Sequence, residues 1–241
     1  MELTIIELLQ GTFSLIFIII SIIIGLHILL KYFEHKRREL IFVGVTWIVL
    51  TFPWLGDAIN LILLILYNSI LDITIYLIIV IAFLPLSILC WLVAFTDLVY
   101  KKGQKVILIV YLVIGVVFEI LFLILLFENP SNIGRYLGPF HVEYSLLTQI
   151  YIIFILISFV VPGIIIARQS LRSEIPNVKL KGKLLLFAFI LVTIGAALDS
   201  LAPLVPLAVL FARIILIISA IAFYGGFMLP NWMKNLFLRE S

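Results

Sequence analysis

Long apolar segments separated by short polar connections make up most of the chain. Runs such as LIFIIISIIIGL are continuous and lack the alternation of apolar and polar residues that marks a membrane β-strand. A helix needs about 20 apolar residues to cross a bilayer. The pattern therefore predicts an all-α integral membrane protein with seven transmembrane helices. The expected spans are at about 12–31, 40–63, 73–97, 106–127, 146–167, 184–202 and 205–229.

The composition agrees with this class. Of the 241 residues, 65% are hydrophobic and 12% are charged, whereas about 25% are charged in soluble domains. Too few polar residues remain to cover a water-exposed surface, so most of the surface must face lipid. The spans fill residues 1–241, which we expect to form a single transmembrane domain without a soluble catalytic domain.

Lysine and arginine residues gather in every second connection. All but two of the 16 lie after the first, third or fifth span or in the C-terminal tail, and the exceptions are Arg135 and Arg213. Cytoplasmic connections are enriched in Lys and Arg, which predicts the N-terminus outside and the C-terminus inside. The isoleucine-rich composition and the single cysteine, Cys90, are typical of a prokaryotic chain. We therefore expect a multi-pass protein of a prokaryotic cell membrane.

The chain lacks the residue patterns of most membrane enzymes and cofactor proteins. Its lysines lie in the connections or at their edges, so a retinal Schiff base inside a span is excluded. His27, His35 and His141 are expected at different depths, which excludes a bis-histidine haem or a histidine zinc site. H-E-x-x-H, G-x-S-x-G and phosphate-binding glycine loops are absent. We expect no enzyme activity, no cofactor and no metal. Without a basic domain, we also expect no nucleic-acid partner.

Four ionisable residues fall inside the predicted spans, namely Asp57, Glu119, Asp199 and Arg213. Such groups are costly in lipid and usually face the bundle interior in pairs, so they are candidates for a functional site. All four are expected in the outer half, where Arg213 would pair with Glu119 or Asp199. Three interpretations stay open: a buried ion pair that fixes helix register, a ligand or ion site in an outward cavity, or side chains that reach the lipid interface.

Prolines and aromatic residues near these charges could shape a cavity. Pro53 and Trp54 interrupt the second span shortly before Asp57, and Pro85 lies six residues before Trp91 in the third span. Proline bends a helix, so we expect kinks at both places and include Trp54 and Trp91 among the candidate pocket residues. The long outer connection, ENPSNIGRYLGPFHVEYS, either caps a pocket or is a plain connector.

Two segments of the chain align without a gap, WIVLTFPWLGD (47–57) and FILVTIGAALD (189–199). The alignment places Thr51 on Thr193 and Asp57 on Asp199. It is consistent with parallel three-helix halves around the fourth span, an arrangement that some transporters use, and chance similarity between apolar segments is the alternative. Thr51 and Thr193 are therefore also candidates for the pocket.

The layout resembles the seven-helix membrane sensor region at the N-terminus of some bacterial and archaeal histidine kinases. The resemblance rests on Trp47, on LPLSILCWLVAFTDLVYKKG (84–103) and on LGPFHVEYSLLTQIYIIFILIS (137–158). It implies a protein that senses a signal in or outside the membrane. The chain departs from the family after FYGGFMLPNWMKNLFLRES, where a coiled coil and kinase would follow. A stand-alone protein of this kind would need a separate signalling partner on the cytoplasmic side.

Three functions are compatible with these features. The first is a receptor-like or sensor-like protein that binds a small ligand or lipid headgroup in an outward-facing polar cavity, where Arg213 would hold an anionic group or keep the acids ionised. The second is a small secondary transporter with parallel three-helix repeats, although a transporter site lies near the midplane and is reached from both sides. The third is a structural membrane subunit without a ligand. The ligand and the oligomeric state, a homo-oligomer included, stay open.

Overall fold

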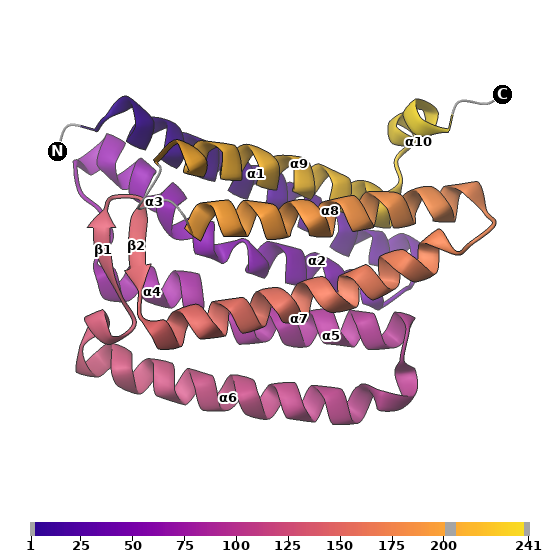
Figure 1. The fold of residues 1–241 in the computed structure, drawn as a ribbon, viewed down its shortest axis with the longest axis horizontal. Coiled ribbons are helices and arrows are strands. Elements are labelled where there is room, and N and C mark those ends of the chain that lie inside the picture. The colour runs from indigo at the N-terminus through magenta and orange to yellow at the C-terminus, as the bar shows by residue number, and fades with distance from the viewer. Residues whose placement is uncertain (1–2, 201–205, 239–241) are drawn as a thin grey trace.

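Long helices lie side by side and run between two ends of an elongated bundle (Figure 1). The structure is a computed structural model that describes residues 3–200 and 206–238. The helices are α1 (Ile5–His35), α2 (Glu39–Leu50), α3 (Phe52–Tyr67), α4 (Ile73–Ile81), α5 (Leu84–Leu98), α6 (Gln104–Glu128), α7 (Leu146–Leu171), α8 (Pro176–Ser200), α9 (Pro206–Met228) and α10 (Asn231–Phe237). Short 3-10 helices, η1 (Lys101–Gly103) and η2 (Pro130–Asn132), flank α6. The strands β1 (Gly134–Gly138) and β2 (His141–Tyr144) precede α7.

The described helices bear out a helical, multi-pass membrane protein. Six of the helices within the described ranges, with α4 and α5 taken together, are long and apolar enough to cross a membrane. The bent pair formed by α2 and α3 makes a seventh when it is counted as one span. We call the end of the bundle that carries β1 and β2 the outer end, because the charge pattern predicts it outside.

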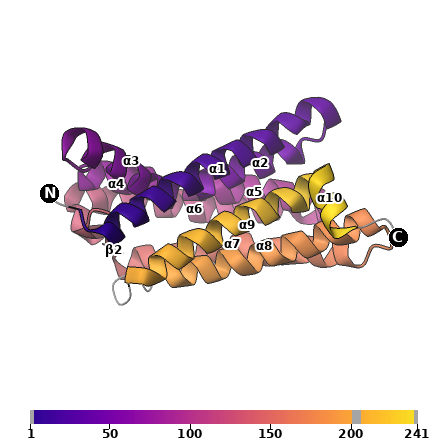
Figure 2. The ribbon, with the colours of Figure 1, turned by 90° about the horizontal axis from the view of Figure 1, so that it is seen from above.

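The second span is broken at Thr51. The helices α2 and α3 meet there at an angle of 50°, and Figure 2 shows α3 turning away from the direction of α2. Pro53 lies in the first turn of α3, where its missing N–H and its ring are tolerated but do not allow the preceding helix to continue straight. The Thr51 hydroxyl donates to the carbonyl of Ile48, 2.7 Å away. The kink that the sequence predicts at Pro53 is therefore present.

The third span has a milder irregularity. The helix α4 ends at Ile81 and α5 begins at Leu84, with Pro85 in its first turn. The two helices nevertheless form one candidate span, Ile73–Leu98. Pro85 thus interrupts the helix where the sequence predicts it, without a large change of direction.

Several helices extend beyond the apolar segments that predicted them. The helix α1 begins at Ile5 rather than near residue 12, because Thr4 and Glu7 form a capping box at its start. It ends at His35, after which Lys36 adopts a left-handed conformation with a φ of 56°. A search for apolar residues misses these polar end turns, since caps rather than lipid stabilise them.

The long outer connection folds into an antiparallel β-hairpin, which an all-α prediction did not include. Arg135 lies opposite Glu143, and their side chains form an exposed ion pair of 2.6 Å. Asn60 of α3 donates to the carbonyl of Pro139, 2.7 Å away, and Gln10 of α1 donates to that of Phe140, 2.7 Å away. The turn is thus held against two spans, so this connection is more than a plain connector.

Helix packing places α6 at the edge of the bundle, whereas the span formed by α4 and α5 is the most buried of the candidate spans in the described ranges. The helix α8 packs against α9 and α7, and α1 packs against α2, α3 and α9. The helix α6 packs mainly against α5 and lies along one side of the bundle (Figure 1). The short helix α10 follows Pro230 at the opposite end from the hairpin, where Met233 packs against Leu180 and Leu184. The apolar pattern predicts no helix in this tail.

Candidate functional site

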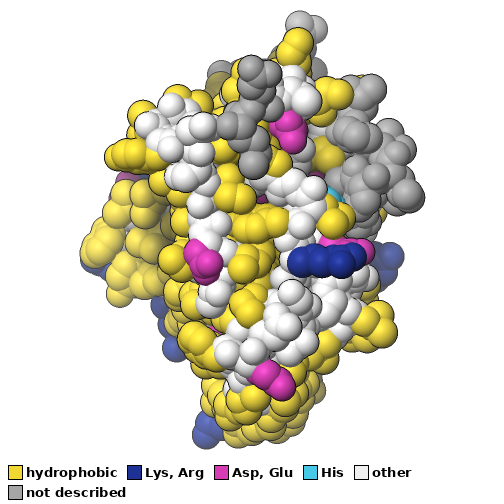
Figure 3. Space-filling view, turned by 90° about the vertical axis from the view of Figure 1, so that its left-hand side faces the viewer, with side chains coloured by type: hydrophobic (Ala, Val, Ile, Leu, Met, Phe, Trp, Pro, Cys, Tyr) yellow, Lys and Arg dark blue, Asp and Glu magenta, His cyan; other side chains and the backbone are white. Residues whose placement is uncertain are grey.

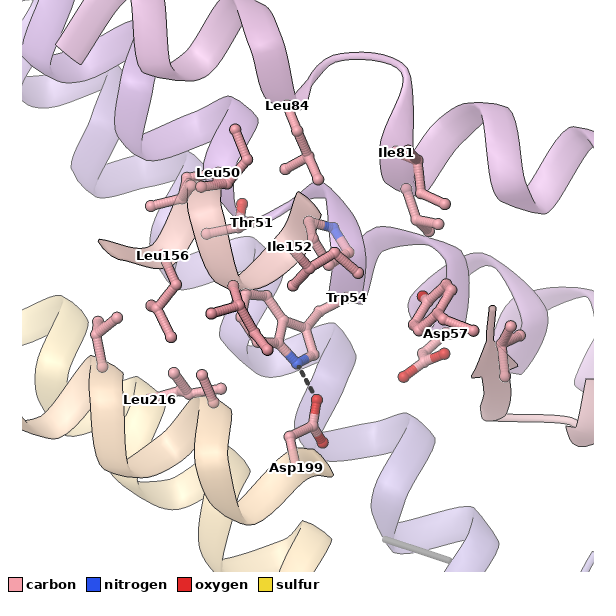
Figure 4. Close-up of a pocket in the computed structure, with 18 of the residues that line it drawn as sticks. Leu50, Thr51, Trp54, Asp57, Ile81, Leu84, Ile152, Leu156, Asp199 and Leu216 are labelled. Atoms are coloured by element: carbon pink, nitrogen blue, oxygen red, sulfur yellow. Dashed lines mark hydrogen bonds between the residues drawn. The ribbon is translucent and has the colours of Figure 1, made fainter. Parts of the chain in front are cut away.

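A cavity of about 620 Å³ lies in the half of the bundle nearest the hairpin. The helices α1, α2, α3, α4, α5, α7, α8 and α9 and the strand β2 all contribute to its lining. Leu50, Leu84, Leu156 and Leu216 form part of an apolar wall (Figure 4). Polar side chains gather at the end nearest the hairpin. The cavity therefore has one polar end and a long apolar remainder.

Arg213 lies between two carboxylates at the polar end. Its Nη2 donates to Oδ2 of Asp57 at 2.9 Å, and its Nη1 lies 3.0 Å from Oδ1 of Asp199, an ion-pair contact without hydrogen-bond geometry. The side chains of Arg213 and Asp57 are 2% and 4% exposed, whereas that of Asp199 is 27% exposed. This triad joins α9, α3 and α8, and Asp199 is its most accessible member.

The remaining carboxylate oxygens of the triad also have partners. The Tyr76 hydroxyl donates to Oδ1 of Asp57 at 2.8 Å. Trp54 Nε1 donates to Oδ2 of Asp199 at 3.1 Å, and Figure 4 shows the two side chains pointing toward one another. The Arg213 guanidinium also lies 5.7 Å from the centre of the Trp54 ring. Two acids and one base thus form a hydrogen-bonded group with an excess of one formal negative charge.

Some buried donors at the cavity have no acceptor among the described residues. Arg213 Nε and Trp47 Nε1 are both in this state, and both side chains line the cavity. An unpaired buried donor is costly, and a bound molecule or water commonly satisfies it. Water in the cavity, or a ligand with an acceptor atom, would satisfy them.

The hairpin covers the polar end. His141, Val142, Glu143 and Tyr144 of β2 all line the cavity. His141 Nε2 is buried and has no partner within the described part of the chain. Burial lowers the pKa of His141, and burial raises the pKa of Tyr144. Both side chains are therefore held in their neutral forms near neutral pH.

An aromatic cluster closes the other end of the cavity. Trp47 stacks on Phe223 with ring centres 4.0 Å apart, and Phe159 packs between Trp47 and Trp91. Trp91 is fully buried and donates from Nε1 to the carbonyl of Phe159 at 2.9 Å. Trp47 and Phe159 line the cavity. We call this group the aromatic floor.

Six of the eight residues proposed from the sequence line the cavity. These are Thr51, Trp54, Asp57, Thr193, Asp199 and Arg213. Trp91 lies behind the floor instead, hydrogen-bonded to Phe159. Glu119 is on the peripheral helix α6, apart from the triad, and its Oε2 is buried without a partner in the described residues. Of the two expected partners of Arg213, Asp199 is therefore paired with it and Glu119 is not. Asp57 is a second partner that was not expected.

Tyr76, His141 and Tyr144 are site residues that the sequence analysis missed. Tyr76 is uncharged and begins an apolar span, so a search for ionisable groups in spans passes over it. The position of Tyr76 in the sequence could have identified it as a site residue. Tyr76 is near the start of one span and Asp57 is near the end of the preceding span, so the two residues lie at similar depth. The other two residues belong to the hairpin, which the periodicity did not predict.

The three acids that line the cavity, Asp57, Glu143 and Asp199, form ion pairs with arginine residues. No group of three or more His, Cys, Asp or Glu side chains in the described ranges is placed to hold a metal ion. Figure 3 views the outer end and shows acidic side chains scattered among apolar ones, with few basic ones.

These features define a multi-pass helical membrane protein with an internal amphipathic cavity. Comparison of the chain with protein-family models, with curated proteins and with solved structures finds no match. The resemblance to the sensor region of histidine kinases therefore stays a prediction.

Proposed function

We propose that the protein is a receptor-like membrane protein that binds a small ligand in this cavity and signals its occupancy to a separate partner on the cytoplasmic side. The observation that carries the proposal is a cavity of about 620 Å³ with one polar end. Ligand sites commonly enclose about 300–1,000 Å³ and combine apolar walls with a few placed polar groups. The triad supplies such groups, while the leucine wall supplies the apolar surface.

The position of the cavity gives occupancy a route to the rest of the bundle. Leu50 and Trp54, which lie on either side of the break at Thr51, both line it. A ligand that contacts both α2 and α3 favours one angle between them over another. It shifts the protein between two states only as far as its affinities for the two states differ.

The aromatic floor favours a receptor over a transporter. A transporter must expose its site to both sides of the membrane in turn. Here Trp47 and Phe159 end the cavity, with Trp91 and Phe223 packed behind them. Transport would require this cluster to separate, whereas binding from the outer half does not.

Thermal unfolding of the purified protein in lipid nanodiscs tests the proposal. The protein is heated with a panel of small anions, amines, lipids and sugars, and a ligand at 100 times its dissociation constant should add about 2.7 kcal/mol of stability. The variant Ala196→Phe fills part of the cavity, because Ala196 lines it. Ile194→Phe is the matched control, since Ile194 is 43% exposed and does not line the cavity.

The proposal requires stabilisation that persists in Ile194→Phe and is lost in Ala196→Phe. No stabilisation by any compound would contradict it and would favour a structural subunit. Uptake of an identified ligand into sealed vesicles would contradict the receptor and favour the transporter.

A further inference from the structure

The cavity reaches the lipid-facing surface between α7 and α8. On α7, Ile150, Ile153 and Ile157 share one helix face and are 57%, 55% and 55% exposed, and Ile153 also lines the cavity. On α8, the exposed residue Thr193 lines the cavity beside the lipid-facing Ile194. Figure 1 shows these helices close together at one end and diverging toward the hairpin. We call the place between Ile153 and Thr193 the lateral opening.

The polar end has an excess of negative charge. The lining includes three acids, Asp57, Glu143 and Asp199, and one base, Arg213. Arg135 neutralises Glu143 through their ion pair, which leaves one formal negative charge. Residues 201–205 read LAPLV and carry no charge that could offset it. A cationic group is therefore attracted to this end, and the attraction is strong where water is excluded.

Asp199 is the most accessible member of the triad, whereas the guanidinium of Arg213 offers a ligand only its buried Nε. Both terminal nitrogens of Arg213 contact carboxylates, and its side chain is 2% exposed. The Asp199 side chain is 27% exposed beside the ring of Trp54. The partly exposed carboxylate of Asp199 is a suitable partner for an ammonium group because of its charge, whereas the Trp54 ring beside it already lies 5.7 Å from the guanidinium of Arg213. An anionic group would instead meet Asp199 and Glu143.

The apolar part of the cavity does not itself discriminate among lipid-derived molecules. Its leucine wall is no more apolar than the lipid tails outside, so moving a hydrocarbon chain from the bilayer into the cavity gains little free energy. The tail positions the ligand between the leucine wall and the aromatic floor. Selection must come from the headgroup, at the triad.

From these observations we infer that the cavity takes a single-chain amphiphile with an ammonium headgroup, which enters from the bilayer through the lateral opening. The inference rests on the proposed function and names the ligand class for that site. The ammonium group lies against Asp199, and the chain lies along Leu156 and Leu216.

Three amphiphiles of equal chain length test the headgroup. Hexadecylamine, hexadecanol and hexadecanoic acid are added at equal mole fractions to phosphatidylcholine nanodiscs that contain the full chain, and the unfolding midpoint is measured at pH 7. We expect the amine to stabilise the protein at a mole fraction at least tenfold lower than the alcohol does, and the acid to have no effect. Equal or stronger stabilisation by the acid or the alcohol overturns the inference.

A pair of charge variants locates the headgroup. Asp199→Asn keeps an oxygen for the hydrogen bond from Trp54 and removes the charge, so the preference for the amine over the alcohol should fall about tenfold. Asp72→Asn is the control, because Asp72 caps α4 next to the same end of the bundle but does not line the cavity. Unchanged selectivity in Asp199→Asn, or an equal loss in Asp72→Asn, contradicts the assignment of the headgroup to Asp199.

A second pair tests the route of entry. Thr193→Trp places an indole in the lateral opening and should slow the onset of amine stabilisation at least tenfold, whereas Ile194→Trp, which faces lipid, should not. Equal onset in both variants overturns lateral entry.

If none of the three amphiphiles stabilises the protein while another compound does so in a manner blocked by Ala196→Phe, this inference fails and the proposed function stands. If no compound stabilises it, both fail.

Discussion

Arg213 of α9 donates a 2.9 Å hydrogen bond to Asp57 of α3, a residue 156 positions earlier in the chain. The two helices have little other direct contact, so this pair ties together the second and the last long span at the outer end. Both side chains are almost fully buried. Charges buried in a membrane protein are stable only when paired, because the loss of hydration is otherwise uncompensated.

The three members of the triad should differ in their effect on stability. Arg213→Ala leaves two adjacent carboxylates without a cation and should cost about 3–5 kcal/mol of unfolding free energy, the range for breaking a buried pair. Asp57→Ala should cost less, since Arg213 keeps Asp199, and Asp199→Ala should cost least because Asp199 is partly exposed. Unfolding in mixed micelles with increasing dodecyl sulfate measures the order. A cost for Asp199→Ala equal to that for Arg213→Ala would contradict this account.

Close packing of α1 against α2 should make Gly44 intolerant of a side chain. A Cβ at Gly44 would lie 2.5 Å from the carbonyl oxygen of Gly25 and 2.8 Å from Cβ of Leu29, so the helices would have to separate. Overpacking of this kind costs about 1–3 kcal/mol, and Gly44→Ala should lower the unfolding midpoint accordingly. Gly138→Ala is the control, because a Cβ there meets nothing within 4 Å. An equal effect of the two substitutions would show that the contact is unimportant.

The hairpin should lose stability in mild acid through His141. Burial lowers the pKa of His141 in the folded protein, whereas nearby Asp199 and Glu143 raise it and Arg213 lowers it. The unfolded chain therefore binds a proton more readily, and His141 contributes stability that is full above about pH 6.5 and falls as the pH drops below that value toward the folded pKa. The unfolding midpoint should thus decrease from pH 7.5 to pH 5 more steeply in the wild type than in His141→Gln. Parallel pH profiles would exclude this contribution.

The predicted orientation can be tested with single cysteines. In a Cys90→Ala background, Ser131→Cys places a thiol in η2 at the outer end and Lys102→Cys places one in η1 at the opposite end, and both native residues are exposed. A membrane-impermeant maleimide should label the Ser131→Cys variant in intact cells and the Lys102→Cys variant only after permeabilisation. The reverse pattern would place the cavity in the cytoplasmic half of the membrane.

Hydrophobic runs predicted the helical membrane class and the approximate places of the spans, because lipid requires long apolar helices whatever their neighbours are. The short connection between the last two spans also made a contact between Asp199 and Arg213 predictable. The pairing of Arg213 with Asp57 was not predictable, because it depends on the direction that α3 takes after Thr51. The isolation of Glu119 depends on α6 lying at the edge of the bundle, and helix order around a bundle is not encoded in hydrophobic periodicity.

The second span supplies both limits of the cavity, with Trp47 from α2 at the aromatic floor and Asp57 from α3 at the polar end. The 50° change of direction between these residues is concentrated at Thr51. Rotation about the backbone of that residue alters the distance from floor to polar end while α2 stays packed against α1 and α5. The length of molecule that fits is therefore set by the angle at a single joint in the chain, and the packing of α3 against α1 and α4 holds that angle.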